Sequence, residues 1–475
     1  MLNKKVKIGY VLRLVLLGIV LLSIAVMITF HMFSRKEGRR DPIYHIRERG
    51  YLVALTDMNT LNYFIYRGEP MGYQLILAEA FAKYLGIPLK IIASNDINKL
   101  MYYLRNNAAD LIALNIPITP YGKKKIKFSA PFGETRLVLV QRKASGEVNK
   151  KALFIRSLKD FPVDTVYVHR NFFLAGLYYL FDKETRHNAI LKEVSDTTQE
   201  ELIRQVAEGK IHYALCFENV AMVYKRFYFN IDISVLAFSL FPYAWGVGHP
   251  SDSLCTKIND WIQKYKASTE LKHTYIEYFD NQRIAGFLQS DYFSVISDKL
   301  SPYDRDIKFL SSWIHWDWRL LASLIYEESN FRPGQISSHK ASGLMQLMPE
   351  IVTKYGLDSL SSPAQQIAAG VKYIHYIDGQ LPEDIFDPIE RIRFVLAAYN
   401  VGINRILAAR EKAKTYGRNP NRWNGHVDYY LLRRSKKDPN FKTDTSALFP
   451  VDYKMEGFVD DIINRYYHYK NLIPE

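Results

Sequence analysis

The sequence has little cysteine: Cys216 and Cys255 are the only two in 475 residues. Two cysteines can form at most one bridge, so a disulfide scaffold is excluded, and so is any zinc or iron–sulfur site that needs several cysteines. Acidic residues are fewer than basic ones, since Lys plus Arg exceed Asp plus Glu by 63 − 49 = 14. This excess favours an anionic partner, and nucleic acid, anionic cell-wall polymer and acidic lipid headgroups all fit it.

The remaining composition is that of packed domains. Hydrophobic residues make up 48% of the chain and charged residues 24%, which excludes wholesale disorder. Beyond an apolar N-terminal segment, about 440 residues remain to fold, enough for about three units at the usual roughly 150 residues per domain.

The N-terminal segment has the features of a membrane anchor. Three lysines among the first seven residues precede an apolar run over 14–33, which is uninterrupted for 17 residues. That length is close to the roughly 20 residues needed to span hydrocarbon, and the one small-x-small pair nearby lies inside the run. We therefore expect residues 1–33 to be an uncleaved anchor rather than a cleaved signal, followed by a linker over 34–44. Basic residues on both sides leave its orientation open.

Residues 45–288 alternate between strand and helix patterns. Strand-like segments at 51–55, 90–93 and 110–114 are separated by an amphipathic stretch at 75–85 and a helical stretch through Leu100. A second set of the same kind follows. Its segments are a strand at 165–168, helices at 173–181 and 200–208, and a strand at 211–216. This rhythm predicts an α/β fold of two lobes with parallel strands and helical crossovers, joined by a hinge, with a small-ligand cleft at the strand ends.

Several motifs in this region resemble a known family. They are GEPMGY at 68–73, LAEAFA at 77–82, DLIA at 110–113, ITP at 118–120 and FSAP at 128–131. Together they resemble the extracellular solute-binding proteins of polar amino-acid transporters (type 2 periplasmic binding proteins). The family's carboxylate-clamping arginine falls on Gly122, and its ammonium-binding aspartate falls on Phe217, with Glu218 beside it. A free zwitterionic amino acid would lose both charge-assisted contacts. The resemblance therefore favours a different ligand, such as a wall peptide, while a spacer without a ligand is the alternative.

The pattern becomes helical in residues 289–475. Tryptophans at 313, 316 and 318 open an apolar periodicity that continues through Leu321 and Ile325 to Glu328. Glu328 thus shares an apolar helix face, where burial favours the protonated carboxyl that can donate a proton. Glu327 is a competitor, because it shares an adjacent face, and for either glutamate a structural ion pair is the common explanation.

Three motifs around Glu328 favour a catalytic role for this residue over a structural ion pair. ESNFRP at 328–333 is followed by ASGLMQLMP at 341–349 and by AAYNVG at 397–402. In this order and spacing they resemble the Slt-type lytic transglycosylases, whose all-α, lysozyme-like domain cuts peptidoglycan. A solute-binding module ahead of such a domain resembles the F group of membrane-bound lytic transglycosylases.

This resemblance implies roles for five residues. Glu328 would be the catalytic acid and base, and Tyr399 would hydrogen-bond and orient it. Asn400 would contact the saccharide, and Ser329 would lie near the acetamide of the reacting sugar. The amide of Gln346 could bind sugar hydroxyls or acetamides.

The residues around these five have structural interpretations. Pro333 and Gly334 are expected to stop the catalytic helix, and Gly343 to permit a close backbone approach. Met345 and Met348 are expected to be packing residues. The family's Glu-x-x-x-Tyr-Val motif matches poorly: a basic insertion over 410–437 intervenes, and EGFV at 456–459 is the nearest match. Glu456 is therefore not assigned a catalytic role.

One acid suits a transglycosylase, because the substrate supplies what a second carboxylate would otherwise provide. The expected reaction cuts the β-1,4 bond between N-acetylmuramic acid and N-acetylglucosamine and closes a 1,6-anhydro ring. No metal or organic cofactor is implied, and the expected partners are glycan strands, wall peptides and the membrane, with no nucleic acid. The expected location is the bacterial envelope, anchored in the membrane with the bulk in the periplasm. A goose-type lysozyme, a catalytically inactive solute sensor and a structural wall-binding protein are the alternatives.

Overall fold

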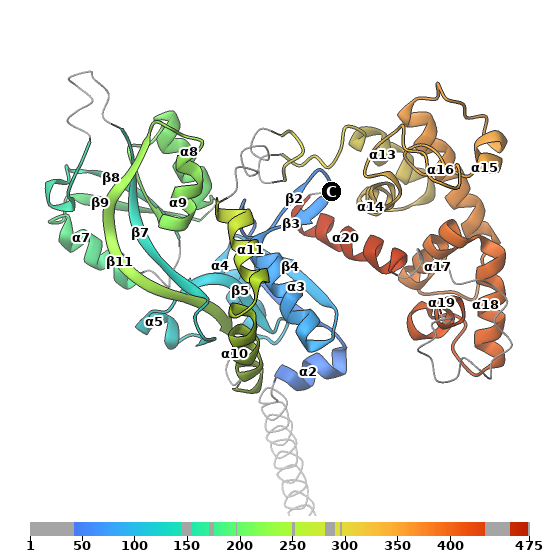
Figure 1. Ribbon diagram of the computed structural model, residues 1–475, viewed down its shortest axis with the longest axis horizontal. Coiled ribbons are helices and arrows are strands. Elements are labelled where there is room, and N and C mark those ends of the chain that lie inside the picture. The colour runs from blue at the N-terminus through green and yellow to red at the C-terminus, as the bar shows by residue number, and fades with distance from the viewer. Residues whose placement is uncertain are drawn as a thin grey trace, which may run out of the picture. The chain divides into compact units, whose positions relative to one another are not determined.

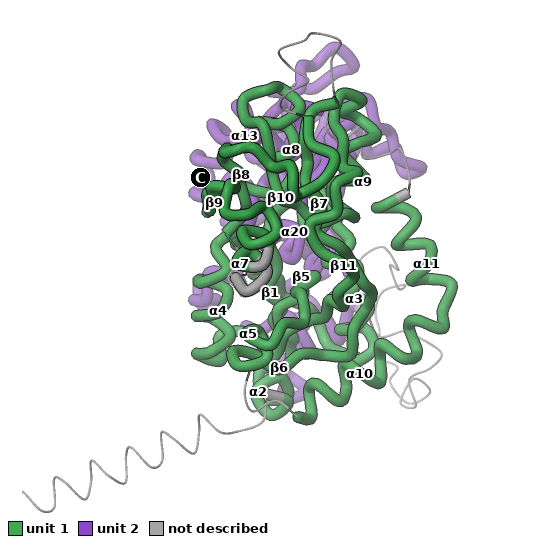
Figure 2. Tube along the Cα trace, turned by 90° about the vertical axis from the view of Figure 1, so that its left-hand side faces the viewer, with its two compact units in different colours: residues 1–63, 72–281 green, residues 64–71, 282–475 purple. Residues whose placement is uncertain are grey.

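The computed structural model describes residues 42–143, 154–170, 175–195, 197–248, 252–280, 290–294, 297–432 and 457–473. The predicted anchor at 1–33 lies outside these residues, and no helix within them is long and apolar enough to cross a membrane. The chain forms two compact units (Figure 2). Unit 1 comprises residues 1–63 and 72–281, and unit 2 comprises residues 64–71 and 282–475.

The first lobe of unit 1 is a parallel sheet with helices, as the sequence pattern predicts. Strand β1 (Leu52–Thr56) pairs in parallel with β4 (Leu89–Ala93) and with β5 (Leu111–Pro117). All five residues of β1 are buried, which is typical of a strand covered on both faces. Helix α3 (Tyr73–Leu85) ends at Gly86, whose φ of 70° gives the left-handed C-cap that glycine adopts without strain. Helix α4 (Ile97–Arg105) follows β4.

The second lobe of unit 1 repeats the arrangement. Strand β8 (Asp164–His169) pairs in parallel with β9 (Ala189–Val194) and with β10 (Tyr213–Phe217). Helices α7 (Ala175–Glu184) and α8 (Gln199–Glu208) connect these strands. The predicted two-lobed α/β class is confirmed.

Two long antiparallel strands join the lobes, which the sequence pattern did not predict. Strand β11 (Ile231–Val247) pairs antiparallel with β5 of the first lobe and with β7 (Gly133–Arg142), and β7 pairs with β10 of the second lobe (Figure 1). The strand order is therefore β4-β1-β5-β11-β7-β10-β8-β9, with β6 (Lys127–Phe128) on β11. The other elements of unit 1 are α2 (Pro42–Arg49), α5 (Pro120–Lys123), η1 (Leu158–Asp160), α9 (Glu218–Lys225), α10 (Asp252–Lys266), α11 (Thr269–Tyr275) and η3 (Ile276–Asp280).

Unit 2 is helical around one large apolar core, which confirms the predicted helical class. Its helices are α13 (Asp304–Ser311), η4 (Ser312–Ile314), α14 (Trp318–Ser329), α15 (Pro349–Lys354), α16 (Pro363–Gln380), α17 (Pro388–Val401), α18 (Ile403–Thr415), η5 (Trp423–Val427), α19 (Tyr429–Leu432) and α20 (Phe458–Leu472). Helix α14 lies against α20 (Figure 1). Much of the expected insertion, from 433 to 456, lies outside the described residues.

Unit 2 also contains a short hairpin from far upstream. Strands β2 (Phe64–Tyr66) and β3 (Glu69–Met71) pair antiparallel, and Ile65 is fully buried in the core of unit 2. From its sequence, this segment was expected to belong to the module at 45–288. Placing 64–71 with the later helices is therefore a result that only the three-dimensional contacts reveal.

Candidate active site and ligand cleft

Helix α14 carries the two candidate acids on its last turn. The helix begins after Asp317, whose side chain accepts a hydrogen bond from the backbone N–H of Arg319. It ends at Ser329, because Asn330 and Phe331 both take left-handed conformations, with φ of 50° and 58°. The expectation that Pro333 and Gly334 stop the helix was wrong: the reversal occurs three residues earlier, at an asparagine that tolerates this conformation.

The start of the catalytic helix also differs from the expected pattern. Trp313 lies in the short helix η4, and His315 has a φ of 55°, which separates that turn from α14. Only Trp318 of the three tryptophans belongs to α14. The apolar periodicity therefore crosses a break in the backbone that periodicity alone does not reveal.

Glu327 has a structural partner. Its Oε2 accepts a hydrogen bond from Nη1 of Arg465 on α20 at 2.8 Å, and the Arg465 guanidinium also lies 4.4 Å from the centre of the Tyr326 ring. This pair ties α14 to α20.

Glu328 interacts electrostatically with Tyr399, the residue that the family resemblance pairs with it. Glu328 is half-buried. Burial raises the pKa of Tyr399 well above its usual value, and the charge of Glu328 raises it further, so the two groups are close enough to interact. The Tyr399 hydroxyl donates to the carbonyl oxygen of Met345 at 2.6 Å. Tyr399 therefore connects helix α17 to the 341–349 motif next to the candidate acid.

Ser329 faces the protein interior. Its side chain is almost fully buried, and its hydroxyl lies 2.8 Å from the carbonyl oxygen of Leu344 and 3.1 Å from that of Ile325. A hydroxyl has one hydrogen, so this hydrogen is shared between two backbone acceptors. In this structure Ser329 fastens the end of α14 to the loop, and its contact with a sugar acetamide stays a prediction.

Gln346 stabilises the loop it belongs to. Its Nε2 donates to the carbonyl oxygens of Gln335 and Gly343, both at 2.9 Å. Both N–H groups are therefore used within the loop, and its Oε1 is the atom that remains to accept from a sugar hydroxyl or amide. Gln346 itself has a φ of 44°, a conformation that these two bonds help to hold.

Glycine at 343 is required by the close approach of a side chain. Gly343 has a φ of 81°, and a Cβ there would lie 2.6 Å from Oε1 of Gln366. That oxygen accepts from the backbone N–H of Leu344 at 2.8 Å. Gln366, on α16, is a residue that the sequence analysis missed, because nothing local in the sequence relates it to the loop.

The two methionines of the motif behave differently. Met345 is buried against Gly370 of α16, as expected of a packing residue. Met348 is 47% exposed and precedes α15, so the expectation that it packs was wrong. Residues 343–346 form turns and Leu347 forms an isolated bridge with Ser342, so helical spacing does not apply to the two methionines.

Asn400 lies on the last turn of α17, one residue after Tyr399, and is half-buried. Gly402, with a φ of 90°, separates α17 from α18 and ends the helix there. In unit 2 the structure thus brings three segments together. They are the end of α14, which carries Glu328, the 341–349 loop, which carries Gln346, and the end of α17, which carries Tyr399 and Asn400.

Unit 1 contains a cleft lined by residues of both lobes. Phe217 lines this cleft, whereas the neighbouring Glu218 is paired with Arg136 at 3.6 Å. Gly122 is buried in α5, where Thr119 caps the helix, and is not part of the lining. Both thiols, of Cys216 and Cys255, are free and buried, so no bridge joins them.

The chain matches two protein-family models. Residues 53–281 match the bacterial extracellular solute-binding proteins, family 3, and residues 311–421 match the transglycosylase SLT domain. The prediction of both domains, in this order, is confirmed.

Curated relatives match over most of the chain. A membrane-bound lytic murein transglycosylase F from Desulfosudis oleivorans is 28% identical over 94% of this chain and 96% of its own length. One from Alcanivorax borkumensis is 27% identical over 85% of each chain. The crystal structure of a mutant of ArgBP from T. maritima covers 50% of this chain and all of its own, with 21% identity and a TM-score of 0.43. In this chain a region similar to the family 3 solute-binding proteins thus precedes a region similar to the transglycosylase SLT domain.

Proposed function

We propose that this protein cleaves peptidoglycan as a lytic transglycosylase, with Glu328 as its single acid and base. Glu328 protonates the glycosidic oxygen between N-acetylmuramic acid and N-acetylglucosamine, and the acetamide of the muramic sugar stabilises the positive charge that develops at its anomeric carbon. The resulting carboxylate then takes the proton from the 6-hydroxyl of the same sugar, whose oxygen closes the 1,6-anhydro ring. The proton returns to Glu328, and no water is consumed.

One observation carries this proposal: Glu328 lies on the last turn of α14, within electrostatic reach of Tyr399 on α17. The surrounding residues fit supporting roles. Tyr399 positions Glu328, Gln346 offers its amide oxygen, Asn400 offers a side-chain amide to the saccharide, and Ser329 keeps the helix end against the loop.

The experiment compares Glu328→Gln with Glu327→Gln on purified sacculi. We expect Glu328→Gln to lower the rate of muropeptide release by about 10²- to 10⁴-fold, as for the loss of a general acid. Glu327→Gln breaks a partly exposed ion pair and should keep most of the activity. Mass analysis of the products completes the test.

A product lighter by one water than the hydrolysis product identifies the anhydro form. A reducing-end product would instead select a goose-type lysozyme reaction. Equal release by the wild type and Glu328→Gln would exclude Glu328 as the acid, and no release by the wild type would favour a solute sensor.

The proposal extends to location and to unit 1. Residues 1–33 anchor the chain in the membrane of the envelope, with the rest in the periplasm, as their length and apolar character suggest. The cleft of unit 1 binds a wall-derived peptide that regulates the enzyme. Alkaline extraction of membranes tests the first statement, because an anchored protein stays in the pellet. A version starting at residue 34 should become soluble.

A further inference from the structure

The parallel strands of the first lobe give unit 1 two different edges. The cleft lies at the edge where these strands end, since Asp57 follows β1, Ser94 follows β4 and Asn115 lies near the end of β5. At the opposite edge the same three strands begin, and the helices that connect them, α3 and α4, end. Helix α2 lies at this second edge too, because Arg49 at its end is paired with Asp110, the residue before β5.

The second edge presents exposed basic and aromatic side chains, and we call it the basal face. Each of its three helices, α2, α3 and α4, contributes one exposed cation and one exposed tyrosine. In chain order these six residues are Tyr44, Arg47, Lys83, Tyr84, Tyr102 and Arg105. The tyrosines are 58%, 37% and 65% exposed. Within residues 42–49, 82–85 and 102–105, Glu48 is the one acidic residue, so the basal face is positively charged.

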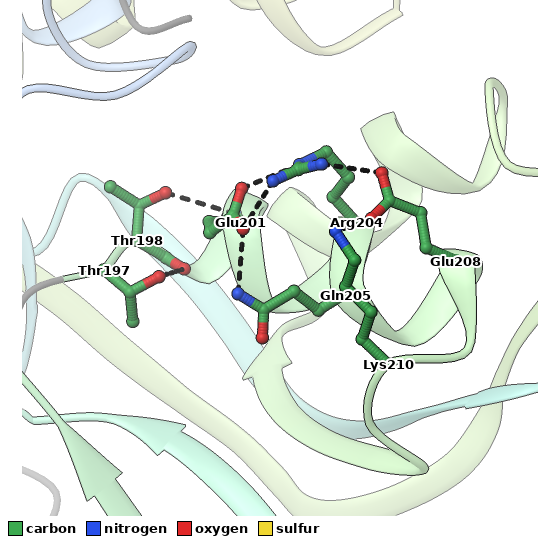
Figure 3. A network of polar contacts seen from close by, with 7 residues as sticks. All are labelled: Thr197, Thr198, Glu201, Arg204, Gln205, Glu208 and Lys210. Carbon is green, nitrogen blue, oxygen red and sulfur yellow. Dashed lines mark hydrogen bonds and ion pairs between the residues drawn. The ribbon is translucent and has the colours of Figure 1, made fainter.

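The three cations of the basal face have no acidic partner among the residues that the structure describes. Basic side chains of the second lobe provide the contrast. Arg204 binds Glu201 and Glu208 along α8, and Lys210 binds Glu208 at 2.7 Å (Figure 3). The charges of that network are largely neutralised within the protein, whereas those of the basal face are available to an anionic partner.

The helix dipole explains the position of the cations but not that of the tyrosines. Arg47, Lys83 and Arg105 each lie in the last turn of a helix, where a positive charge is favourable. An exposed aromatic ring gains nothing from that dipole. A tyrosine ring with a basic side chain beside it is instead typical of the boundary between water and lipid, where the ring is partly removed from water and its hydroxyl stays solvated.

The proposed anchor holds this face near a membrane. The eight residues 34–41 separate the anchor at 1–33 from the start of α2. Even when fully extended, a segment of this length spans at most about 30 Å. The start of α2 therefore stays within that distance of the bilayer. Contact between the basal face and the bilayer is then an intramolecular step, for which a weak attraction is sufficient.

We propose that the basal face docks on the membrane that holds the anchor. Its cations contact anionic phosphate headgroups, and its tyrosine rings lie at the level of the headgroups. Docking at this edge leaves the cleft at the opposite edge of the first lobe open to solvent. The inference rests on the anchor proposed above and adds which face of unit 1 meets the lipid.

The test is hydrogen exchange of the full chain reconstituted in two kinds of vesicle. One kind contains phosphatidylcholine alone, and the other also contains phosphatidylglycerol, at about a third of the lipid. We expect amide exchange in residues 43–51, 82–91 and 100–108 to be about threefold slower or more in the anionic vesicles. Exchange in β8 and β10 should be the same in both. About 1 M NaCl should remove the difference, because it shortens the Debye length to about 3 Å.

Two variants of equal net charge separate this face from a general effect of charge. The first carries Arg47→Gln, Lys83→Gln and Arg105→Gln, and glutamine keeps a good helix-forming side chain at each position. The control neutralises three exposed lysines of the second lobe, by Lys183→Gln, Lys192→Gln and Lys210→Gln. We expect the first variant to lose the slowing in anionic vesicles and the control to keep it. Exchange in neutral vesicles shows that each variant is folded, and equal loss in both would overturn the proposal.

The remaining outcomes separate the sources of negative charge and the two proposals. Equal exchange of the wild type in both kinds of vesicle would overturn docking on lipid. Slower exchange on addition of soluble peptidoglycan fragments, with no effect of phosphatidylglycerol, would assign the face to an anionic wall polymer and also overturn it. Alkaline extraction of the same vesicles tests the anchor. If the chain stays in the pellet while exchange at the basal face is unchanged, only this inference fails. If extraction releases the chain, the anchor fails, and exchange with vesicles added to the released chain decides this inference.

Discussion

The hydroxyl of Tyr326 donates a hydrogen bond to a carboxylate oxygen of Glu69 at 3.0 Å, although 257 positions separate the two residues. The same hairpin makes a second contact, because the hydroxyl of Tyr469 donates to the carbonyl oxygen of Gly68 at 2.5 Å. Residues 64–71 therefore contact the last turn of α14, which carries Glu328, at Tyr326 and contact α20 at Tyr469. Their contacts make this hairpin part of the framework of the active-site helix.

The contacts of the hairpin predict that substitution of Gly68 lowers the stability of unit 2. This residue has a φ of 88°, and a Cβ there would lie 2.6 Å from the rings of Phe331 and Tyr326. Gly68→Ala should destabilise unit 2 by about 1–3 kcal/mol, because both the backbone and the packing resist it. Gly334→Ala is the matched control, since a Cβ at 334 meets nothing within 4 Å. Urea unfolding, followed by hydrogen exchange of peptides from unit 2, measures the difference, and equal stabilities would contradict the structural role of the hairpin.

A second pair of glycines tests the support of the 341–349 loop. A Cβ at Gly370 would lie 2.1 Å from the sulfur of Met345, whereas a Cβ at Gly379 on the same helix meets nothing within 4 Å. Gly370→Ala should displace Met345, whose carbonyl holds Tyr399, and cost about 1–3 kcal/mol of stability. Gly379→Ala should stabilise the helix by about 0.5–1 kcal/mol.

Muropeptide release provides the functional readout for this pair. We expect Gly370→Ala to lower it and Gly379→Ala to leave it near the wild-type rate. A decrease of the same size in both variants would show that the clash with Met345 is not the cause of the decrease.

Tyr399 is predicted to position the acid rather than to react. Tyr399→Phe removes the hydrogen bond to Met345 and should lower kcat by about tenfold or more while KM changes little. The acidic limb of the pH–rate profile should also move, since the polar group beside Glu328 is lost. Tyr376→Phe, at a 43% exposed position on α16, is the control. A change in stability without a change in kcat or in the profile would make Tyr399 a packing residue only.

Short sequence patterns predicted the helices and strands that depend on neighbouring residues. Gly86 ends α3, because a helix cap depends on the residues next to it. The alternation of strand and helix patterns predicted the parallel strands β1, β4 and β5, because burial periodicity is visible within a few residues. The periodicity also favoured Glu328 over Glu327, and the ion pair of Glu327 with Arg465 is consistent with that choice.

The features that were not predicted depend on distant partners. The hairpin at 64–71, the crossing strand β11 and the hydrogen bond from Leu344 to Gln366 all join segments that no local pattern relates. The end of α14 was misplaced because proline is a strong breaker, yet Asn330 reverses the chain before Pro333 is reached. Asn330, which tolerates the left-handed conformation, was therefore a better predictor of the end of α14 than Pro333.

Glu200 also predicts how the stability of unit 1 depends on pH. Burial raises its pKa from an ordinary 4.5 to about 7, so the folded state favours the protonated carboxyl. The associated stability is complete below about pH 4.5 and is lost as the pH rises towards 7. Glu200→Gln keeps a neutral side chain at every pH, so it should gain stability relative to the wild type on going from pH 4.5 to pH 8. The expected gain is on the order of 3 kcal/mol or less.

Hydrogen exchange of peptides from β8 and β10, measured across this range in urea, gives the unfolding free energy of unit 1. Glu201→Gln should follow the wild type, because the ion pair of Glu201 with Arg204 is partly exposed and such pairs contribute little to stability. A constant difference between the wild type and Glu200→Gln from pH 4.5 to pH 8 would mean that Glu200 is ionised throughout. The folded state would then not favour the protonated carboxyl, which would contradict the raised pKa of Glu200.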